Sequence, residues 1–213
     1  GVEQIPGTGL LAASIPGAFD AWMLMLQDYG SLSLSNVLEP AISYARDGVP
    51  IVPKLMKSIT QLQGWFNQAW PENAAIYLQD GALPREGSLL RNPALADMYQ
   101  RTLDEAEATG TDRKKQIAAA RQIWKTGFVA EAIDTFSCKT KHLDITGQKN
   151  GGLITGDDLA GWSATYEDPT SSVFCGKTIC KTAPWGQGPV LLQGLALAQA
   201  KGISNIEPDS AQF

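Results

Sequence analysis

Residues 150–160 read NGGLITGDDLA, and this stretch decides how the segments on either side of it fold. Gly151 and Gly152 can adopt the positive φ angles that end a helix, so they predict a helix end and a tight turn. Thr155 and Asp158 stand three residues apart, as in a capping box, where each side chain accepts a hydrogen bond from the backbone amide of the other. The stretch therefore predicts that a new helix starts directly after the turn.

Helical patterns dominate residues 14–141. Apolar residues recur there at every third or fourth position, which is the spacing of one face of a helix. The first helix is predicted over residues 16–29, and its buried face is expected to contain Phe19, Trp22, Met23, Leu26 and Tyr29. Further helices are predicted to start near Ser35, Pro53, Asn92 and either Thr111 or Asp112, with a break at Gly127.

Residues 150–213 form a second region, which is predicted to be rich in strands. Short β-prone runs cover residues 163–166, 170–174 and 178–182, and a further extended piece is expected at residues 76–78. Pro189 begins a helix that is apolar on most sides and is therefore expected to be buried. Helices followed by strands indicate the α+β class, mainly helical with a short antiparallel sheet, and we expect residues 1–213 to form a single partial domain.

The composition argues against several kinds of partner. The formal charge is −5 and only 18% of the residues are charged, whereas a nucleic-acid surface needs a concentrated basic patch. Arg113-Lys114-Lys115 is a short basic run, and it is expected to be a solvated face of a helix. No apolar run approaches the roughly 20 residues that span a bilayer, so no membrane partner is expected. The sequence does not indicate a compartment.

Cys138, Cys175 and Cys180 predict structural thiols. Their odd number leaves at least one unpaired, and a turn at Gly176-Lys177 would offset Cys175 from Cys180 along a hairpin. Zinc is not expected, because His142 is the single histidine and has no Cys-x-x-Cys companion. We therefore expect buried thiols and no cofactor or metal.

Five blocks of sequence follow one another in the order found in a known family. They are IPG at residues 15–17, LEPAI with ARDG at 38–48, DG with NPALA at 80–96, NGGLITGDDLA at 150–160, and APWGQGP at 183–189. Along most of its length the chain resembles the gamma-glutamyltransferase family of N-terminal-nucleophile hydrolases, as an internal segment of the large subunit. It departs from the family's usual Pro-rich turn in the last block, and residues 109–126 look longer than the corresponding connection.

This resemblance implies a fold, an activity and a partner. The family fold is an αββα sandwich, of which this chain would supply outer helices and an edge of the sheet. The implied activity is transfer or hydrolysis of the gamma-glutamyl group of glutathione-type amides, without a cofactor. An N-terminal Thr, Ser or Cys, whose own α-amine acts as the base, is the nucleophile. The implied partner is the remainder of the parent enzyme, including the small subunit that carries this nucleophile.

The chain itself is expected to lack this active site. Gly1 has no nucleophilic side chain, and no Thr-x-His segment follows residue 183. No arginine precedes Arg46, although the family's arginine for the substrate carboxylate would lie before the first helix. Thr140-Lys141-His142 is similar to the nucleophile segment but lies in the wrong place. We therefore assign no catalytic, substrate-binding or metal residue within the chain and expect it to be inactive alone.

The remaining candidates have plainer structural interpretations. Asp157 and Asp158 are adjacent and point different ways in a helix, which favours capping over paired acid–base catalysis. Glu167-Asp168 before a proline predicts a solvated turn. The Gly186-Gln187-Gly188 loop is predicted to be a structural turn and Trp185 a buried anchor, with contact to a substrate at a helix start as the alternative.

Two classes of function stay open. The first is a segment of a gamma-glutamyltransferase-like enzyme; cephalosporin acylases are similar at this level, so the acyl group is not fixed. The second is a non-catalytic module that keeps the scaffold and binds another molecule, or forms a homodimer through the apolar C-terminal helix. A Thr-x-His segment beyond Phe213 in the reading frame would favour the enzyme.

Overall fold

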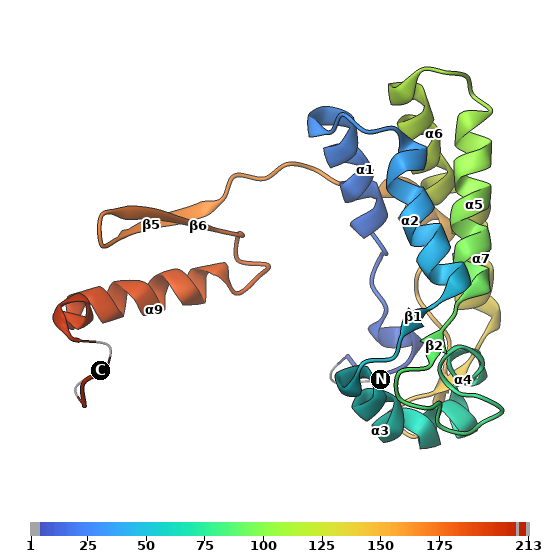
Figure 1. Cartoon of the computed structure of the whole chain (residues 1–213), viewed down its shortest axis with the longest axis horizontal. Coiled ribbons are helices and arrows are strands. Elements are labelled where there is room, and N and C mark those ends of the chain that lie inside the picture. The colour runs from blue at the N-terminus through green and yellow to red at the C-terminus, as the bar shows by residue number, and fades with distance from the viewer. Residues whose placement is uncertain (1–4, 208, 212–213) are drawn as a thin grey trace. The chain divides into compact units, whose positions relative to one another are not determined.

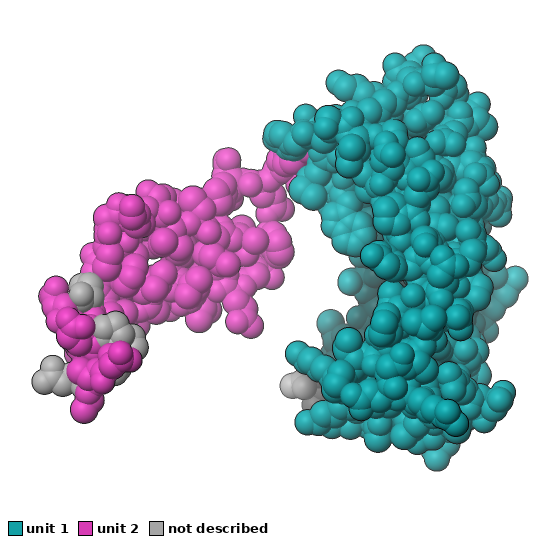
Figure 2. Space-filling view, viewed as in Figure 1, with its two compact units in different colours: residues 1–164 teal, residues 165–213 magenta. Residues whose placement is uncertain are grey.

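The computed structural model describes residues 5–207 and 209–211 and divides the chain into two compact units. Figure 2 colours residues 1–164, unit 1, in teal and residues 165–213, unit 2, in magenta. Unit 1 is mainly helical, whereas unit 2 combines one β-hairpin with one long helix (Figure 1). The predicted α+β class, mainly helical with short antiparallel sheets, is confirmed. The interpretation of residues 1–213 as one partial domain of a larger fold stays a prediction.

Helices make up most of unit 1. They are α1 (Ala18–Tyr29), α2 (Leu34–Asp47), α3 (Pro53–Ala69), α4 (Pro71–Tyr77), α5 (Pro93–Glu107), α6 (Arg113–Thr126), α7 (Phe128–Lys139) and α8 (Gly156–Gly161), after a short 3-10 helix at Leu10–Ala12. Within the described residues, no helix is both long and apolar enough to cross a bilayer.

Among the described residues, the strands pair as three two-stranded antiparallel ladders. In unit 1, β1 (Val49–Pro50) pairs with β2 (Leu89–Leu90), and β3 (His142–Leu143) pairs with β4 (Lys149–Asn150). In unit 2, β5 (Thr170–Phe174) pairs with β6 (Lys177–Lys181), before α9 (Gly188–Ala200) and a 3-10 turn at Ile203–Asn205.

Local caps begin several helices where the sequence predicted them. The side chains of Asn92 and Asp112 each accept a hydrogen bond from the amide three residues further on, at 3.1 and 2.8 Å. Pro53 occupies the first turn of α3, and Gly127 separates α6 from α7. These signals act within one turn of the chain, so the sequence alone is enough to read them.

The main hydrophobic core of unit 1 is shared by α1, α2, α5 and α6. Its buried members are Phe19, Met23, Leu34, Leu38, Ile42, Ala96, Leu103, Ala106, Ile117 and Ala120. A second cluster, made of Ile51, Ile59, Phe66 and Leu78, forms separately around α3 and α4. The α3–α4 hairpin therefore has a small core of its own.

The predicted buried face of α1 is correct for Phe19 and Met23 and wrong for Trp22 and Tyr29, which are both exposed. Trp22, for example, exposes 54% of its surface. Since each helical residue turns the chain by about 100°, Trp22 lies about 60° short of a full turn from Phe19. The side chain of Trp22 therefore lies outside the buried face of α1 that contains Phe19 and Met23.

Two predicted extended segments are not strands. Residues 71–77 form α4, because Pro71, which was expected to end the preceding helix, occupies the first turn of the next one. Residues 163–166 are irregular, and Asp20 accepts a hydrogen bond from Ala164 N at 2.8 Å. Contacts made across the fold thus override the β-propensity of this short run.

Two glycine predictions also differ from the structure. Gly151 and Gly152 have ordinary φ angles and follow β4, so they do not end a helix. Gly152 is instead needed for close approach, since a Cβ there would lie 2.2 Å from Ser137 Oγ. In unit 2, Cys175 and Gly176 form the hairpin turn, both at positive φ, one residue before the predicted turn.

The C-terminal helix was expected to be buried on most sides, but in unit 2 only one side of it is buried. In α9, Leu192 is buried, whereas Val190, Leu191 and Leu197 are exposed. The β5–β6 hairpin packs along one side of this helix (Figure 1). Coverage of the other sides by the rest of a parent protein stays a prediction.

Candidate functional site

The loop between β6 and α9 is the part of the chain for which the sequence left contact with a substrate open. Gly186 N donates to Ala183 O at 3.0 Å, which closes a tight turn. Gln187, the residue before α9, makes no side-chain cap, and Pro189 in the first helical turn has no N–H. The helix start therefore presents few backbone donors to a ligand.

Close packing explains the two glycines of this loop. A Cβ at Gly188 would lie 2.2 Å from Thr182 O, and a Cβ at Gly186 would lie 2.6 Å from Thr182 Oγ1. Any larger residue would push the loop away from the end of β6. These contacts favour the structural-turn interpretation of Gly186-Gln187-Gly188.

Trp185 is exposed, so the prediction of a buried anchor is wrong. Its side chain exposes 73% of its surface, and its indole N–H donates to Glu167 Oε2 at 2.7 Å. This hydrogen bond holds the ring beside a shallow concavity of unit 2 that Asp168 and Lys181 also line. Glu167 and Asp168 are exposed, as predicted, but they lie in an irregular segment and not in a turn. The concavity combines an aromatic wall with two carboxylates and one ammonium group.

Thr155 and Asp158 form the predicted capping box at the start of α8. Thr155 Oγ1 accepts from Asp158 N at 3.2 Å, and Asp158 Oδ2 accepts from Thr155 N at 2.9 Å. The hydrogen bonds from Thr155 hold the pKa of Asp158 below its usual value. Because an ionised carboxylate cannot donate a proton, Asp158 is suited to capping and unsuited to general acid catalysis.

His142 contacts the α3–α4 hairpin. Its Nδ1 lies 2.9 Å from Ala69 O, and its Nε2 lies 3.1 Å from Glu72 Oε2. A histidine that activates a nucleophile is hydrogen-bonded to a hydroxyl or thiol, and neither of these partners is one. The contacts of His142 therefore favour a structural role for the Thr140-Lys141-His142 segment over a role in activating a nucleophile.

The cysteines Cys138, Cys175 and Cys180 are exposed free thiols, so the prediction that they are buried is wrong. Desolvation, and then the carboxylate of Asp134, raises the pKa of Cys138. A raised pKa leaves little of the reactive thiolate at neutral pH. Among residues 5–207 and 209–211, no three His, Cys, Asp or Glu side chains are grouped as ligands for a metal ion.

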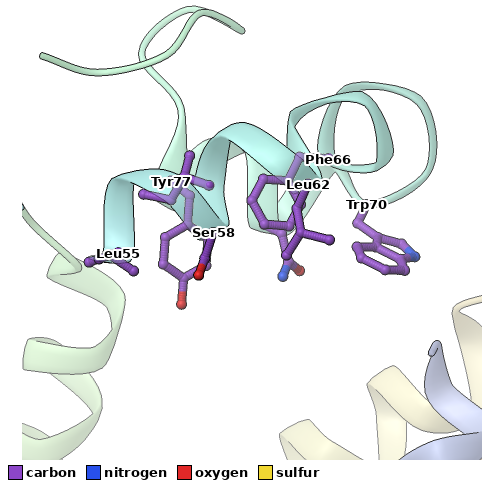
Figure 3. Close-up of a pocket in the computed structure, with 8 residues that line it drawn as sticks. Leu55, Ser58, Leu62, Phe66, Trp70 and Tyr77 are labelled. Atoms are coloured by element: carbon purple, nitrogen blue, oxygen red, sulfur yellow. The ribbon is translucent and has the colours of Figure 1, made fainter. Parts of the chain in front are cut away.

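An apolar groove runs along the α3–α4 hairpin, and the sequence did not predict it. Its lining residues are Leu55, Ser58, Ile59, Leu62, Phe66, Trp70, Asn73 and Tyr77 (Figure 3). The lining residues on α3 follow helical spacing, so the sequence could predict that they share one face. The side of the groove that α4 forms was not predicted, because residues 76–78 were expected to be extended. No lining residue is a carboxylate, histidine or thiol, so the groove offers no side chain for acid–base catalysis.

Comparison with known proteins gives a family match over nearly the whole chain. The matching family is described as Gamma-glutamyltranspeptidase, and the match covers residues 1–212. The Glutathione hydrolase-like YwrD proenzyme of Bacillus subtilis (strain 168) is 27% identical over 214 residues, which cover 100% of this chain and 36% of that protein. The chain thus spans only about a third or less of the curated relatives it matches.

Solved structures are similar to this chain as well. The structure of LmbA2991T421A is 47% identical, with a TM-score of 0.86, over 92% of this chain and 33% of that chain. The cephalosporin acylase from Bacillus halodurans is 26% identical, with a TM-score of 0.74, over 93% of this chain and 34% of that chain. Both similarities cover more than nine tenths of the chain.

Proposed function

Because the chain belongs to the gamma-glutamyltranspeptidase family, we propose that it is a segment of an enzyme acting on the gamma-glutamyl group of glutathione-type amides. The enzyme would transfer this group to an acceptor or hydrolyse it. The observation that carries the proposal is the family match over residues 1–212, supported by curated relatives named as glutathione hydrolase proenzymes.

The division of labour within the parent protein follows from the chemistry. The reaction needs a nucleophile, a base and donors that stabilise the oxyanion. In this chain His142 is engaged with Ala69 and Glu72, Asp158 caps α8, and the thiol of Cys138 has a raised pKa. We infer that this chain contributes scaffold, and that the nucleophile and the carboxylate-binding arginine lie outside residues 1–213.

A second candidate function is supported by a different comparison. The similarity to a cephalosporin acylase is compatible with an amidohydrolase that releases a different acyl group. Scaffold and mechanism would be shared, and only the pocket for the acyl chain would differ. The third possibility is a non-catalytic module of the same fold.

Expression of the complete reading frame distinguishes these proposals. We expect the product to split into two chains, with Thr, Ser or Cys at the new N-terminus, as measured by mass spectrometry. The processed protein should release the aniline from a gamma-glutamyl anilide and leave an N-acylated cephalosporin intact. The reverse substrate preference would support the acylase, and an unprocessed protein that acts on neither substrate would support the non-catalytic module.

A further inference from the structure

The NGGLITGDDLA stretch begins with an Asn-Gly step that the proposed function does not use. Asn150 ends β4, and Gly151 follows it in an irregular segment. In the whole 213-residue sequence this is the one place where an asparagine precedes a glycine. Because glycine has no Cβ, its backbone nitrogen is less hindered than that of any other residue. The side chain of Asn150 therefore has the least hindered neighbouring amide of all the asparagines in the chain.

The side chain of Asn150 stabilises a buried carboxylate. Its Nδ2 donates to Asp144 Oδ2 at 2.8 Å, and Asp144 is 1% exposed. Thr146 donates to the other oxygen of Asp144, both from its backbone N, at 2.8 Å, and from its hydroxyl. None of the ion pairs found among residues 5–207 and 209–211 includes Asp144, so neutral donors stabilise its charge.

These donors keep Asp144 ionised. The hydrogen bond from Asn150, followed by those from Thr146, outweighs burial and lowers the pKa of Asp144 below its ordinary value. The ordinary value for an aspartate is about 3.9, so this carboxylate is an anion at neutral pH. Any second negative charge at the position of the Asn150 amide would therefore face an existing one.

The turn that starts at Asp144 also holds residues 8–9. Ile145 N donates to Thr8 Oγ1 at 3.0 Å. A Cβ at Gly9 would lie 2.7 Å from Asp144 Cβ, so this close approach requires a glycine. The β3–β4 hairpin that carries the turn has only two residue pairs. The packing of residues 8–9 thus depends on a short hairpin that the Asn150 amide stabilises.

An asparagine that precedes a glycine can react with its own backbone. The glycine nitrogen attacks Cγ of the asparagine and forms a new C–N bond, while the C–N bond to Nδ2 breaks. Nδ2 leaves as ammonia and carries away the proton of the attacking nitrogen, which leaves a succinimide ring. Water then adds to either carbonyl of the ring and opens it, giving aspartate or isoaspartate. Water is the single co-reactant, and no group is oxidised or reduced.

We propose that Asn150-Gly151 is a site of spontaneous deamidation, and that the reaction opens the β3–β4 hairpin. In the closed hairpin Asp144 holds the Asn150 amide, so the reaction proceeds during local openings of this short ladder. The product places a carboxylate oxygen where Nδ2 lay 2.8 Å from Asp144 Oδ2, and two carboxylates at this distance repel each other. Since the ammonia has left, the hydrogen bond cannot form again, and residues 8–9 lose the turn against which they pack.

Peptide mass spectrometry of the 213-residue chain, incubated at mildly alkaline pH without denaturant, tests the site. We expect the peptide that contains Asn150 to show the conversion of amide to acid before the peptide of any other asparagine. Gly151→Ala should slow this conversion about tenfold, because the new Cβ hinders the attacking nitrogen. That variant is tolerated sterically, since the atom nearest to the Cβ would lie 3.5 Å from it.

Gly161→Ala is the matched control, because a Cβ there meets no atom within 4 Å, and it should keep the wild-type rate. Two results would overturn the proposal. One is a Gly151→Ala variant that is converted as fast as the wild type. The other is a folded chain that stays unconverted under conditions in which a synthetic peptide of residues 144–156 is converted completely.

Equilibrium unfolding in urea at neutral pH tests the consequence. Asn150→Asp reproduces one product, and its unfolding constant should exceed that of Asn150→Ala by about tenfold, because Asn150→Ala removes the donor without adding a charge. Asn36→Asp makes the same exchange at an exposed position in the first turn of α2, where a negative charge is favourable, and should unfold no more readily than wild type.

Equal unfolding constants for Asn150→Asp and Asn150→Ala would refute the opening of the hairpin by charge repulsion. Should Asn150→Asp fail to fold, the deamidated wild type, separated from the intact chain by its additional negative charge, gives the same comparison. A deamidated chain that unfolds no more readily than the intact one would refute the proposed consequence as well.

Discussion

At the scale of single residues, Asp20 is a buried carboxylate in unit 1 that is paired with an arginine. Its side chain is 1% exposed, and its two oxygens accept hydrogen bonds from Arg121 Nε at 2.6 Å and Nη2 at 3.0 Å. Ala164 N donates to the same carboxylate. Burial by itself would raise the pKa of Asp20, but the hydrogen bonds from Arg121 and Ala164, with the positive charge of Arg121, outweigh burial and lower it.

Asp20→Asn should therefore remove an acid-sensitive part of the stability. Because the folded-state pKa is lowered, the contribution is complete above the unfolded value of about 3.9 and is lost as the pH falls through the folded value. We expect a cost of about 3–5 kcal/mol at neutral pH, since Arg121 loses a buried anionic partner. The variant should also lose less stability than wild type when the pH falls below about 4.

Urea unfolding between neutral and acidic pH measures both effects. Asp97→Asn is the control, because Asp97 forms an exposed ion pair with Arg46 at 3.5 Å, and its loss should cost less than about 1 kcal/mol. An Asp20→Asn variant with the acid sensitivity of the wild type would show that the carboxylate does not carry this dependence.

Gly152→Ala should destabilise the chain by about 1–3 kcal/mol, because the new Cβ would overlap Ser137 Oγ. Ser137 Oγ is buried without a hydrogen-bond partner in the described structure, so Ser137→Ala should be nearly neutral and should relieve part of the clash. A double-mutant cycle by thermal unfolding checks this, and purely additive effects would speak against the contact. Gly151→Ala is the control, since the atom nearest to a Cβ added at Gly151 would lie 3.5 Å from it, which is ordinary van der Waals contact.

These residues also mark what the sequence can predict at this scale. The capping pair Thr155 and Asp158 was predictable, because both partners lie within one turn of the chain. The role of Gly152 was not, because its reason is Ser137, a residue on α7 that only the fold brings near. The exposure of Trp185 likewise depends on Glu167, which lies across the hairpin.

At the scale of elements, α8 depends on its capping box. Thr155→Ala should destabilise unit 1 by about 0.5–2 kcal/mol, because Asp158 N loses its acceptor. Asp157→Asn changes the adjacent carboxylate outside the box and should stay within about 0.5 kcal/mol of wild type. Thermal unfolding of both variants gives the comparison. Equal losses for the two would mean that charge at the helix start, and not the reciprocal hydrogen bonds, stabilises α8.

Helices were predictable where the sequence contained both an apolar residue at every third or fourth position and a capping residue or proline at the helix start. The apolar stripes of α5 and α6 and the starts at Pro53 and Asn92 follow from local spacing. The segment at residues 71–77 was misread because a proline can end one helix or begin the next, and only packing against α3 decides between them. Short β-prone runs such as residues 163–166 carry too little information to outweigh tertiary contacts.

At the scale of the whole molecule, we expect the 213-residue chain to be folded and catalytically inactive. Among the described residues, His142 contacts Ala69 and Glu72, Asp158 caps α8, and the pKa of the Cys138 thiol is raised, so these three form no nucleophile–base pair. Release of the aniline from a gamma-glutamyl anilide by the purified chain measures this. Turnover that one substitution within residues 1–213 abolishes would show that the chain carries an active site of its own.

The helix α9 determines how the purified chain should behave in solution. Its exposed Val190, Leu191 and Leu197 lie on a helix that, among the described residues, packs against the β5–β6 hairpin and the Ile203–Asn205 turn and leaves these side chains in contact with water. Faces of this kind promote association when they exceed a few hundred Å². We therefore expect light scattering to detect a dimer, or a hydrophobic dye to bind to the monomer.

Leu191→Glu with Leu197→Glu should abolish this association and the dye binding, while the chain stays folded, because both side chains already contact solvent. Leu192→Ala is the matched contrast: the residue is buried against the hairpin, so its truncation should cost about 2–5 kcal/mol and leave the exposed face intact. If the glutamate pair unfolds unit 2 and the wild type is monomeric without binding dye, α9 is already covered within this chain. Unit 2 would then be a self-sufficient domain, and the inference that a parent scaffold covers this helix would be wrong.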